Sequence, residues 1–158
     1  MIKYMNLIGI KARKASEYKV TTEVKNKVLN DYAKLIKNEK KFIINQNSKD
    51  INYARKRGLK ENLIKRLHLN ENKLNGIINS ILKIAKLRDP INNTLEKWKR
   101  PNGLSIKRVS IPIGVIGVIY ESRPNVTSDV ASLCFKSGNV VILKGGSEAI
   151  NSNKALAK

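Results

Sequence analysis

The residues between 114 and 144 restrict the fold more than any other part of the sequence. Two apolar runs lie there, Val115–Tyr120 and 140–144. Nearly continuous runs of this kind are typical of strands covered on both faces by other elements. The residues between them fit a helix at 127–137, closed by Gly138-Asn139. The pattern therefore predicts a strand–helix–strand unit of a parallel sheet, with a right-handed crossover.

Helical periodicity dominates residues 1–93. Residues 3–18 mix apolar and basic positions and predict a short amphipathic helix. A second helix is expected to begin at Thr21-Thr22-Glu23, where a threonine caps free backbone N–H groups and an acid lies in the first turn. Apolar residues at three- and four-residue steps predict its buried face. They are Val24, Val28, Tyr32, Leu35 and Ile36.

More helical segments follow. Asn38 is expected to cap a helical segment through Ile43 and Ile44. Asn47 or Ser48 is expected to cap a separate helix at 51–57, which ends at Gly58. A short helix is expected around residues 63–67. A longer helix is predicted from Asn70 to just before Asp89-Pro90. Its apolar stripe comprises Leu74, Ile77, Ile78, Ile81, Leu82 and Ala85.

A hairpin is predicted after the helices. Residues 94–99 and 104–111 alternate apolar and polar side chains, and Pro101-Asn102-Gly103 lies between them. The basic side chains of this ribbon should face solvent or an oligomer partner. They are Lys97, Lys99, Lys107 and Arg108.

The predicted fold class is thus α/β. It comprises amino-terminal helices over 1–93, a β-ribbon over 94–111 and, over 112–158, the start of a Rossmann-like dinucleotide-binding strand–helix–strand unit. Two parallel strands and a hairpin do not complete such a sheet, so we expect one incomplete domain.

The formal net charge of +20 leaves two explanations open. Such a charge can serve nucleic-acid binding. It can also be a solvated surface, because lysine, asparagine and isoleucine are over-used together, as in an AT-rich coding sequence. Binding to single strands uses aromatic side chains among the basic ones, and aromatics make up only 5% of the chain. We therefore favour the solvated surface and expect no nucleic-acid partner.

Other features exclude further classes. The single cysteine, Cys134, excludes a disulfide framework, and His68 is the only histidine, so no metal site is expected. Cys134 lies on an apolar helical stretch, and we assign both residues structural roles. The first residues resemble no secretory signal, and no apolar run of about 18 residues occurs, which predicts a cytoplasmic protein without a membrane partner.

Two strand–helix junctions are candidate sites, because ligands bind at the carboxyl ends of parallel strands. In the first, residues 120–127, Arg123 offers a fork of donors for a phosphate or carboxylate and Asn125 an amide that can stabilise an oxyanion. The alternative makes Glu121 and Arg123 a surface pair and Asn125 or Thr127 a helix cap.

In the second junction, Gly145 and Gly146 let backbone approach a ligand at a helix start, and Lys144 adds charge. The alternative is an ordinary glycine turn between strand and helix.

The run at 111–127, with Glu121-Ser122-Arg123-Pro124-Asn125-Val126-Thr127, closely resembles the gamma-glutamyl phosphate reductase family of the aldehyde dehydrogenase superfamily. Residues 9–16, Gly58-Leu59 with Arg66-Leu67, and 136–139 leading to 143–148 agree as well. The resemblance implies NADPH-dependent reduction of L-glutamyl 5-phosphate to L-glutamate 5-semialdehyde in L-proline biosynthesis, by a homo-oligomer whose catalytic cysteine forms a thioester.

Residue by residue, the resemblance implies that Lys144 contacts the adenosine ribose of NADPH and that Gly145 and Gly146 face this cofactor. Ser147 or Glu148 falls near an acidic cofactor contact, and Asn125 near an oxyanion-hole asparagine.

Because the chain is shorter than family members, we expect it to be an amino-terminal part without a preceding kinase domain. We expect the catalytic cysteine beyond Lys158 and no activity from these residues alone. The remaining alternatives are a basic nucleic-acid-binding protein and a remnant that pairs through the 94–111 ribbon.

Overall fold

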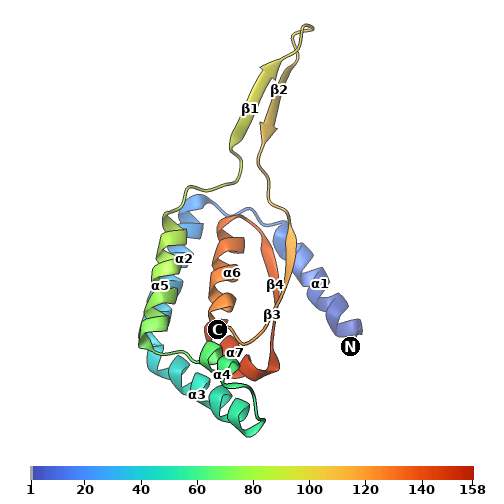
Figure 1. Cartoon of the computed structure of the whole chain (residues 1–158). Coiled ribbons are helices and arrows are strands. Elements are labelled where there is room, and N and C mark those ends of the chain that lie inside the picture. The colour runs from blue at the N-terminus through green and yellow to red at the C-terminus, as the bar shows by residue number, and fades with distance from the viewer. Residues whose placement is uncertain (1) are drawn as a thin grey trace.

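The computed structural model describes residues 2–158, in which a helical body carries a small parallel sheet and a projecting hairpin (Figure 1). Five helices come first: α1 (Ile2–Ser16), α2 (Thr22–Asn38), α3 (Lys40–Lys56), α4 (Glu61–Leu67) and α5 (Glu71–Lys86). The hairpin strands are β1 (Thr94–Lys99) and β2 (Ser105–Val109). The remaining elements are β3 (Val115–Tyr120), α6 (Asn125–Lys136), β4 (Val140–Gly145), the 3-10 turn η1 (Ser147–Ala149) and α7 (Ile150–Leu156).

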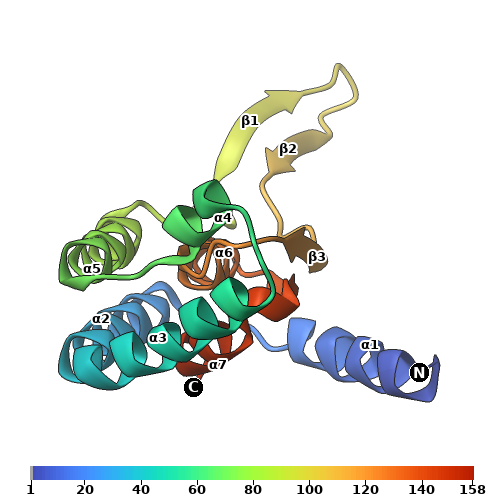
Figure 2. The ribbon, with the colours of Figure 1, turned by 60° about the horizontal axis from the view of Figure 1, so that its bottom comes forward.

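The predicted strand–helix–strand unit is confirmed. β3 and β4 pair in parallel, from Val115 opposite Val140 to Tyr120 opposite Gly145, and α6 is the crossover. The prediction that β3 is covered on both faces is wrong for this chain, since Ile119 keeps 81% of its surface exposed. The reason is that α6 packs on one side of the sheet while α1, on the other, lies mainly along β4. Figure 2 shows α1 set apart from the other helices.

The main core lies where α2, α5 and α6 pack together, and Leu156 of α7 is part of it. The predicted apolar stripe of α5 is a large part of it and is confirmed, except that Leu82 is only partly buried. The α5 cap is confirmed too, because the Asn70 side chain accepts a hydrogen bond from the Lys73 N–H. Burial of this stripe orients α5 along α2.

The buried face of α2 differs from the predicted one. Thr21 caps the helix as predicted, accepting from the Val24 N–H. However, Val24, Val28 and Leu35 are exposed. The buried residues are Lys25, Leu29, Ala33 and Ile36. Both faces of α2 carry apolar side chains, and the packing of α5 and α6 determines which of them is covered.

α3 runs without a break from Lys40 to Lys56, so the two capped segments predicted here are wrong. Asn47 lies buried in mid-helix, where its amide donates to the Leu67 carbonyl and to the Ser152 hydroxyl, each at 2.9 Å. Its oxygen accepts from the Leu69 N–H at 2.8 Å. The short polar side chain thus joins α3 to the end of α4 instead of starting a helix.

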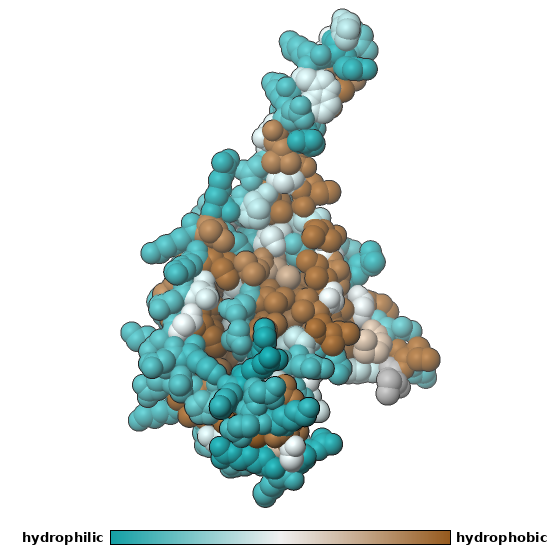
Figure 3. All heavy atoms as spheres, in the orientation of Figure 1, coloured by the Kyte–Doolittle hydropathy of each residue, from teal (hydrophilic) through white to brown (hydrophobic). Residues whose placement is uncertain are grey.

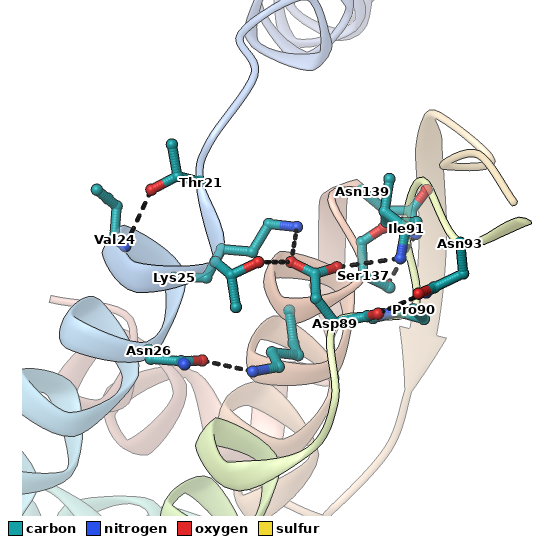
Figure 4. A network of polar contacts seen from close by, with 12 residues as sticks. Thr21, Val24, Lys25, Asn26, Asp89, Pro90, Ile91, Asn93, Ser137 and Asn139 are labelled. Atoms are coloured by element: carbon teal, nitrogen blue, oxygen red, sulfur yellow. Dashed lines mark hydrogen bonds and ion pairs between the residues drawn. The ribbon is translucent and has the colours of Figure 1, made fainter.

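A polar cluster anchors the base of the hairpin (Figure 4). The Asp89 carboxylate accepts from Lys25 Nζ at 2.9 Å, from Thr22 Oγ1 at 2.8 Å and from the Ile91 N–H at 3.0 Å. The Asn93 amide donates to the Asp89 carbonyl at 2.7 Å. These bonds fix the chain where it leaves α5, and Lys25 is only 4% exposed because Asp89 pairs with it.

The predicted hairpin is confirmed, with β1 and β2 antiparallel and Trp98 opposite Ile106. Gly103 has a φ of +86° in its turn, a conformation that glycine adopts without strain. The ribbon projects from the body and carries mainly hydrophilic side chains at its tip, while apolar side chains gather below it over the region of β3 and β4 (Figures 1 and 3). Within residues 2–158, no helix has both the length and the apolar character needed to span a membrane.

Candidate functional site

The two strand–helix junctions meet at one end of the parallel sheet. β3 ends at Tyr120 and β4 at Gly145, and these two residues are partners in the strand register. The segments that follow, 121–124 and 146–149, therefore lie next to each other. This arrangement, expected from the sequence, is the place where open α/β sheets bind ligands.

The first junction contains a residue in a strained conformation. Ser122 has a φ of +39°, in the left-handed region that non-glycine residues rarely adopt, and is only 4% exposed. The next residue, Arg123, is exposed, and Pro124 after it is buried. The described residues contain no ion pair between Glu121 and Arg123, so the surface-pair alternative is not observed and the guanidinium of Arg123 faces solvent.

Asn125 is the first residue of α6, and its side chain makes no cap: its amide nitrogen donates to Asp129 Oδ2 at 3.1 Å. Thr127 is not a cap either. Its hydroxyl contacts the Tyr120 hydroxyl at 2.6 Å and donates to Asn153 Oδ1 at 3.2 Å. The helix begins two residues before the predicted start, which places Thr127 inside its first turn, facing the sheet.

In the second junction the two glycines make room for side chains of the chain itself. A Cβ on Gly145 would overlap the Asn153 amide, and one on Gly146 would overlap the Glu148 carboxylate. Gly146 has an ordinary φ of −67°, so space, and not backbone conformation, requires glycine there. Lys144 and Ser147 are exposed beside them.

Glu148 connects the two junctions. Its Oε1 accepts from the Ser122 N–H at 2.7 Å and from the Ser122 hydroxyl at 3.0 Å. Burial alone would raise the pKa of Glu148, but hydrogen bonds from its own N–H and from Ser122, with the charge of Lys144, lower it below the ordinary 4.5. The carboxylate is therefore ionised at neutral pH.

All five residues predicted to bind the cofactor, Lys144, Gly145, Gly146, Ser147 and Glu148, thus lie in one junction, beside the turn that carries Arg123 and Asn125. Sequence reasoning missed Ser122, Tyr120 and Asn153 as parts of this site. Asn153 has no signal in its own neighbourhood, because its partner Thr127 is 26 residues away.

Cys134 and His68 lie outside both junctions. Cys134 is buried on α6, and burial raises the pKa of its thiol, which makes it a poor nucleophile and agrees with the structural role predicted. His68 is exposed at the end of α4. Residues 2–158 hold no group of three or more histidine, cysteine, aspartate and glutamate side chains suited to a metal ion.

Known proteins resemble the chain in sequence. It is 48% identical over 156 residues to a gamma-glutamyl phosphate reductase of Halothermothrix orenii, which covers 96% of this chain and 37% of that protein. It is 46% identical over 158 residues to the one of Clostridium tetani, covering 99% of this chain and 37% of the relative. The chain therefore spans little more than a third of the length of these curated relatives. No protein-family model matches it.

Solved structures agree. A crystal structure of gamma-glutamyl phosphate reductase from Thermotoga maritima superimposes with a TM-score of 0.89 at 43% identity, over 92% of this chain and 36% of that one. The corresponding Saccharomyces cerevisiae structure gives a TM-score of 0.91 at 33% identity, over 96% and 39%. In sequence and fold, the chain belongs to the gamma-glutamyl phosphate reductase family and corresponds to the amino-terminal part of its members.

Proposed function

We propose that this chain forms the amino-terminal part of an enzyme that reduces L-glutamyl 5-phosphate to L-glutamate 5-semialdehyde and phosphate with NADPH, in L-proline biosynthesis. The observation that carries the proposal is the meeting of the two junctions at the ends of β3 and β4, within a segment that shares 46% identity with the Clostridium tetani reductase. A cytoplasmic location, and a homo-oligomer that uses the hairpin, belong to the same proposal.

Arg123 is proposed to bind the phosphate of the substrate. Its exposed guanidinium makes no ion pair within residues 2–158, and a guanidinium can give two parallel hydrogen bonds to phosphate oxygens. Asn125 begins α6 two positions later. An amide has two N–H donors and Asp129 takes one, so the other is free to stabilise an oxyanion on the reacting acyl group.

The second junction is proposed to hold NADPH, which supplies the hydride when bound. The donor set fits a nucleotide: the exposed ammonium of Lys144 suits a ribose hydroxyl or a phosphate, and the ionised Glu148 suits a hydroxyl donor. Ser147 is exposed at the start of η1 and can add a hydroxyl. Gly145 and Gly146 are proposed to face the cofactor, with the Asn153 amide and the Glu148 carboxylate lying against them.

The 158-residue chain offers no accessible thiol, because its one cysteine is buried, so the purified chain should not reduce glutamyl phosphate. Reduction by this chain, or NADP- and phosphate-dependent oxidation of the semialdehyde, would contradict the proposal. The positive test is a chimera in which residues 1–158 replace the matching segment of the Clostridium tetani reductase. We expect the chimera to be active, and Arg123→Ala to raise the KM for glutamyl phosphate.

A lysine on the hairpin supplies the control for the cofactor site. In the chimera, Lys144→Ala should raise the KM for NADPH, whereas Lys99→Ala, which removes the same charge from the exposed ribbon, should not. Equal effects of the two substitutions would show that general positive charge, and not the second junction, attracts the cofactor.

A further inference from the structure

We infer that Glu148 is a positioning residue whose carboxylate clamps the Ser122 turn and thereby holds Arg123 and Asn125 in place. The identity of the ligand at Arg123 rests on the proposed function. The clamp itself rests only on contacts between two junctions that are 26 residues apart in sequence.

The Ser122 turn needs an external partner. A serine at a φ of +39° carries backbone strain, and such a conformation persists only where the surrounding structure determines it. The connection from Tyr120 to Asn125 is short, and the ring of Pro124 fixes its φ at −57°. The backbone around Ser122 therefore has little conformational freedom. The direction of Arg123 therefore depends on the conformation that Ser122 adopts.

Glu148 supplies that partner. Both donors of Ser122, the backbone N–H and the hydroxyl, converge on Oε1 of Glu148, at 2.7 and 3.0 Å. Hydrogen bonds to an ionised acceptor are roughly twice as strong as neutral ones. Gly146 is part of the device, since a side chain there would occupy the position of the carboxylate. Ser122 has only 4% of its surface exposed, so water competes weakly for this contact.

The clamp also couples the two sides of the proposed site. Both Ser122 hydrogen bonds end on Oε1 of Glu148, so Oε2 can accept from a group on the other side. Lys144 is the charged group whose field acts on this carboxylate. A change at the β4 junction would thus be transmitted through Glu148 to the turn before α6.

Nuclear magnetic resonance on the 158-residue chain tests the clamp without any ligand. The Ser122 amide proton should titrate with a midpoint below pH 4.5, as the Glu148 carboxylate protonates, and Glu148→Gln should abolish the titration. Glu148→Ala should speed hydrogen exchange of the Ser122 amide by about tenfold or more. Glu148→Gln, which keeps an acceptor oxygen, should largely restore protection. The matched control, Glu121→Ala, removes an exposed carboxylate from the same junction and should change neither readout.

A second readout uses inorganic phosphate and follows the Arg123 side-chain signals. Phosphate should shift them in the wild-type chain, and Glu148→Ala should weaken that binding severalfold, although the loss of a negative charge near the arginine would by itself favour an anion. Ser122→Ala, which removes one donor and should leave the fold intact, should weaken it less. Unchanged exchange at Ser122 in Glu148→Ala would overturn the clamp. A normal clamp without phosphate binding would instead count against the proposed role of Arg123.

Discussion

Asp50 holds the start of α7 through Ser152, 102 residues further along the chain. Its Oδ2 accepts from the Ser152 N–H at 2.7 Å and from the Ser152 hydroxyl at 2.6 Å. Its Oδ1 accepts from the backbone and side-chain nitrogens of Asn151, at 3.1 and 2.7 Å. Because η1 and Glu148 immediately precede α7, this buried carboxylate of α3 also fixes the second junction of the site.

Replacing Asp50 should destabilise the chain strongly. Asp50 is 1% exposed, and Asp50→Ala would leave up to four donors without partners, a loss of about 3 kcal/mol or more in the free energy of unfolding. Urea denaturation followed by circular dichroism measures it. Asp31→Ala makes the same change in charge at an exposed side chain and should alter stability by less than about 0.5 kcal/mol. Similar losses in the two variants would show that the Asp50 contacts contribute little.

Asp89 should make stability depend on acid pH. Burial opposes ionisation, but hydrogen bonds from Lys25, the Ile91 N–H and Thr22, with the charge of Lys25, lower the pKa of Asp89 below its ordinary 3.8. A group whose pKa is lower in the folded state contributes stability that is present above the unfolded pKa and lost as pH falls through the folded pKa. This contribution should therefore be present above the ordinary pKa of 3.8 and should be lost as the pH falls below it, through the lower pKa of the folded state.

The measurement compares wild type with Asp89→Asn across that range. The difference in free energy of unfolding should be largest near neutral pH and should shrink on acidification. Glu148, whose pKa is also lowered, contributes equally to both proteins and cancels in the difference. Glu23 does not cancel fully, because the charge of Asp89 acts on its pKa. A difference that stays constant with pH would mean that Asp89 acts through its shape and neutral hydrogen bonds.

Trp98, the only tryptophan, should report the charge of the hairpin. Its side chain is 39% exposed, opposite Ile106, and Lys97 lies directly opposite Lys107 on the neighbouring pair. We expect iodide to quench its fluorescence severalfold more than caesium at low salt. Added salt should reduce this difference, because it screens exposed charges over about 10 Å at 0.1 M.

Paired charge reversals test which lysines cause the preference for iodide. Lys97→Glu with Lys107→Glu should equalise or reverse the preference for iodide. The same reversals at Lys11 and Lys14 of α1, which are exposed and lie away from the hairpin, should leave the preference in place (Figure 1). If both pairs act alike, the net charge of the chain governs quenching and the ribbon has no local field of its own.

Local patterns sufficed to predict the elements that depend on neighbouring residues. The caps Thr21 and Asn70, the hairpin turn and the parallel pair of strands all lie where the sequence places them. Contacts between distant segments could not be predicted in this way. Lys25 is buried because Asp89, 64 residues away, pairs with it, and no periodicity within α2 reveals that partner.

The same limit applies to the candidate site. Arg123, Asn125 and Lys144 stand out in sequence because their chemistry is visible in the residue type. Ser122 does not, since its strained φ and its bonds to Glu148 arise only when β3 and β4 pair. The glycines at 145 and 146 were expected to admit a ligand, but the space they leave is also used by Asn153 and Glu148.

Two serines one turn apart on α6 should respond in opposite ways to the same substitution. Ser128 is fully buried and its hydroxyl lies 2.8 Å from the Tyr32 hydroxyl. Tyr32 uses its one hydrogen to donate to the Leu156 carbonyl at 2.7 Å, so Ser128 is the donor of the pair. Ser132 is also buried, and its hydroxyl oxygen has no hydrogen-bond partner among residues 2–158.

Ser128→Ala should therefore lower the free energy of unfolding by about 1 kcal/mol, because it removes the hydrogen bond between Ser128 of α6 and Tyr32 of α2. Ser132→Ala should raise the free energy of unfolding by about 1 kcal/mol, since it removes a buried hydroxyl that makes no hydrogen bond. The higher helix propensity of alanine adds roughly 0.5 kcal/mol to both variants and cancels in the comparison. Urea denaturation of the two variants gives the difference directly. If Ser132→Ala proves as destabilising as Ser128→Ala, the Ser132 hydroxyl has a partner in solution, such as a buried water molecule.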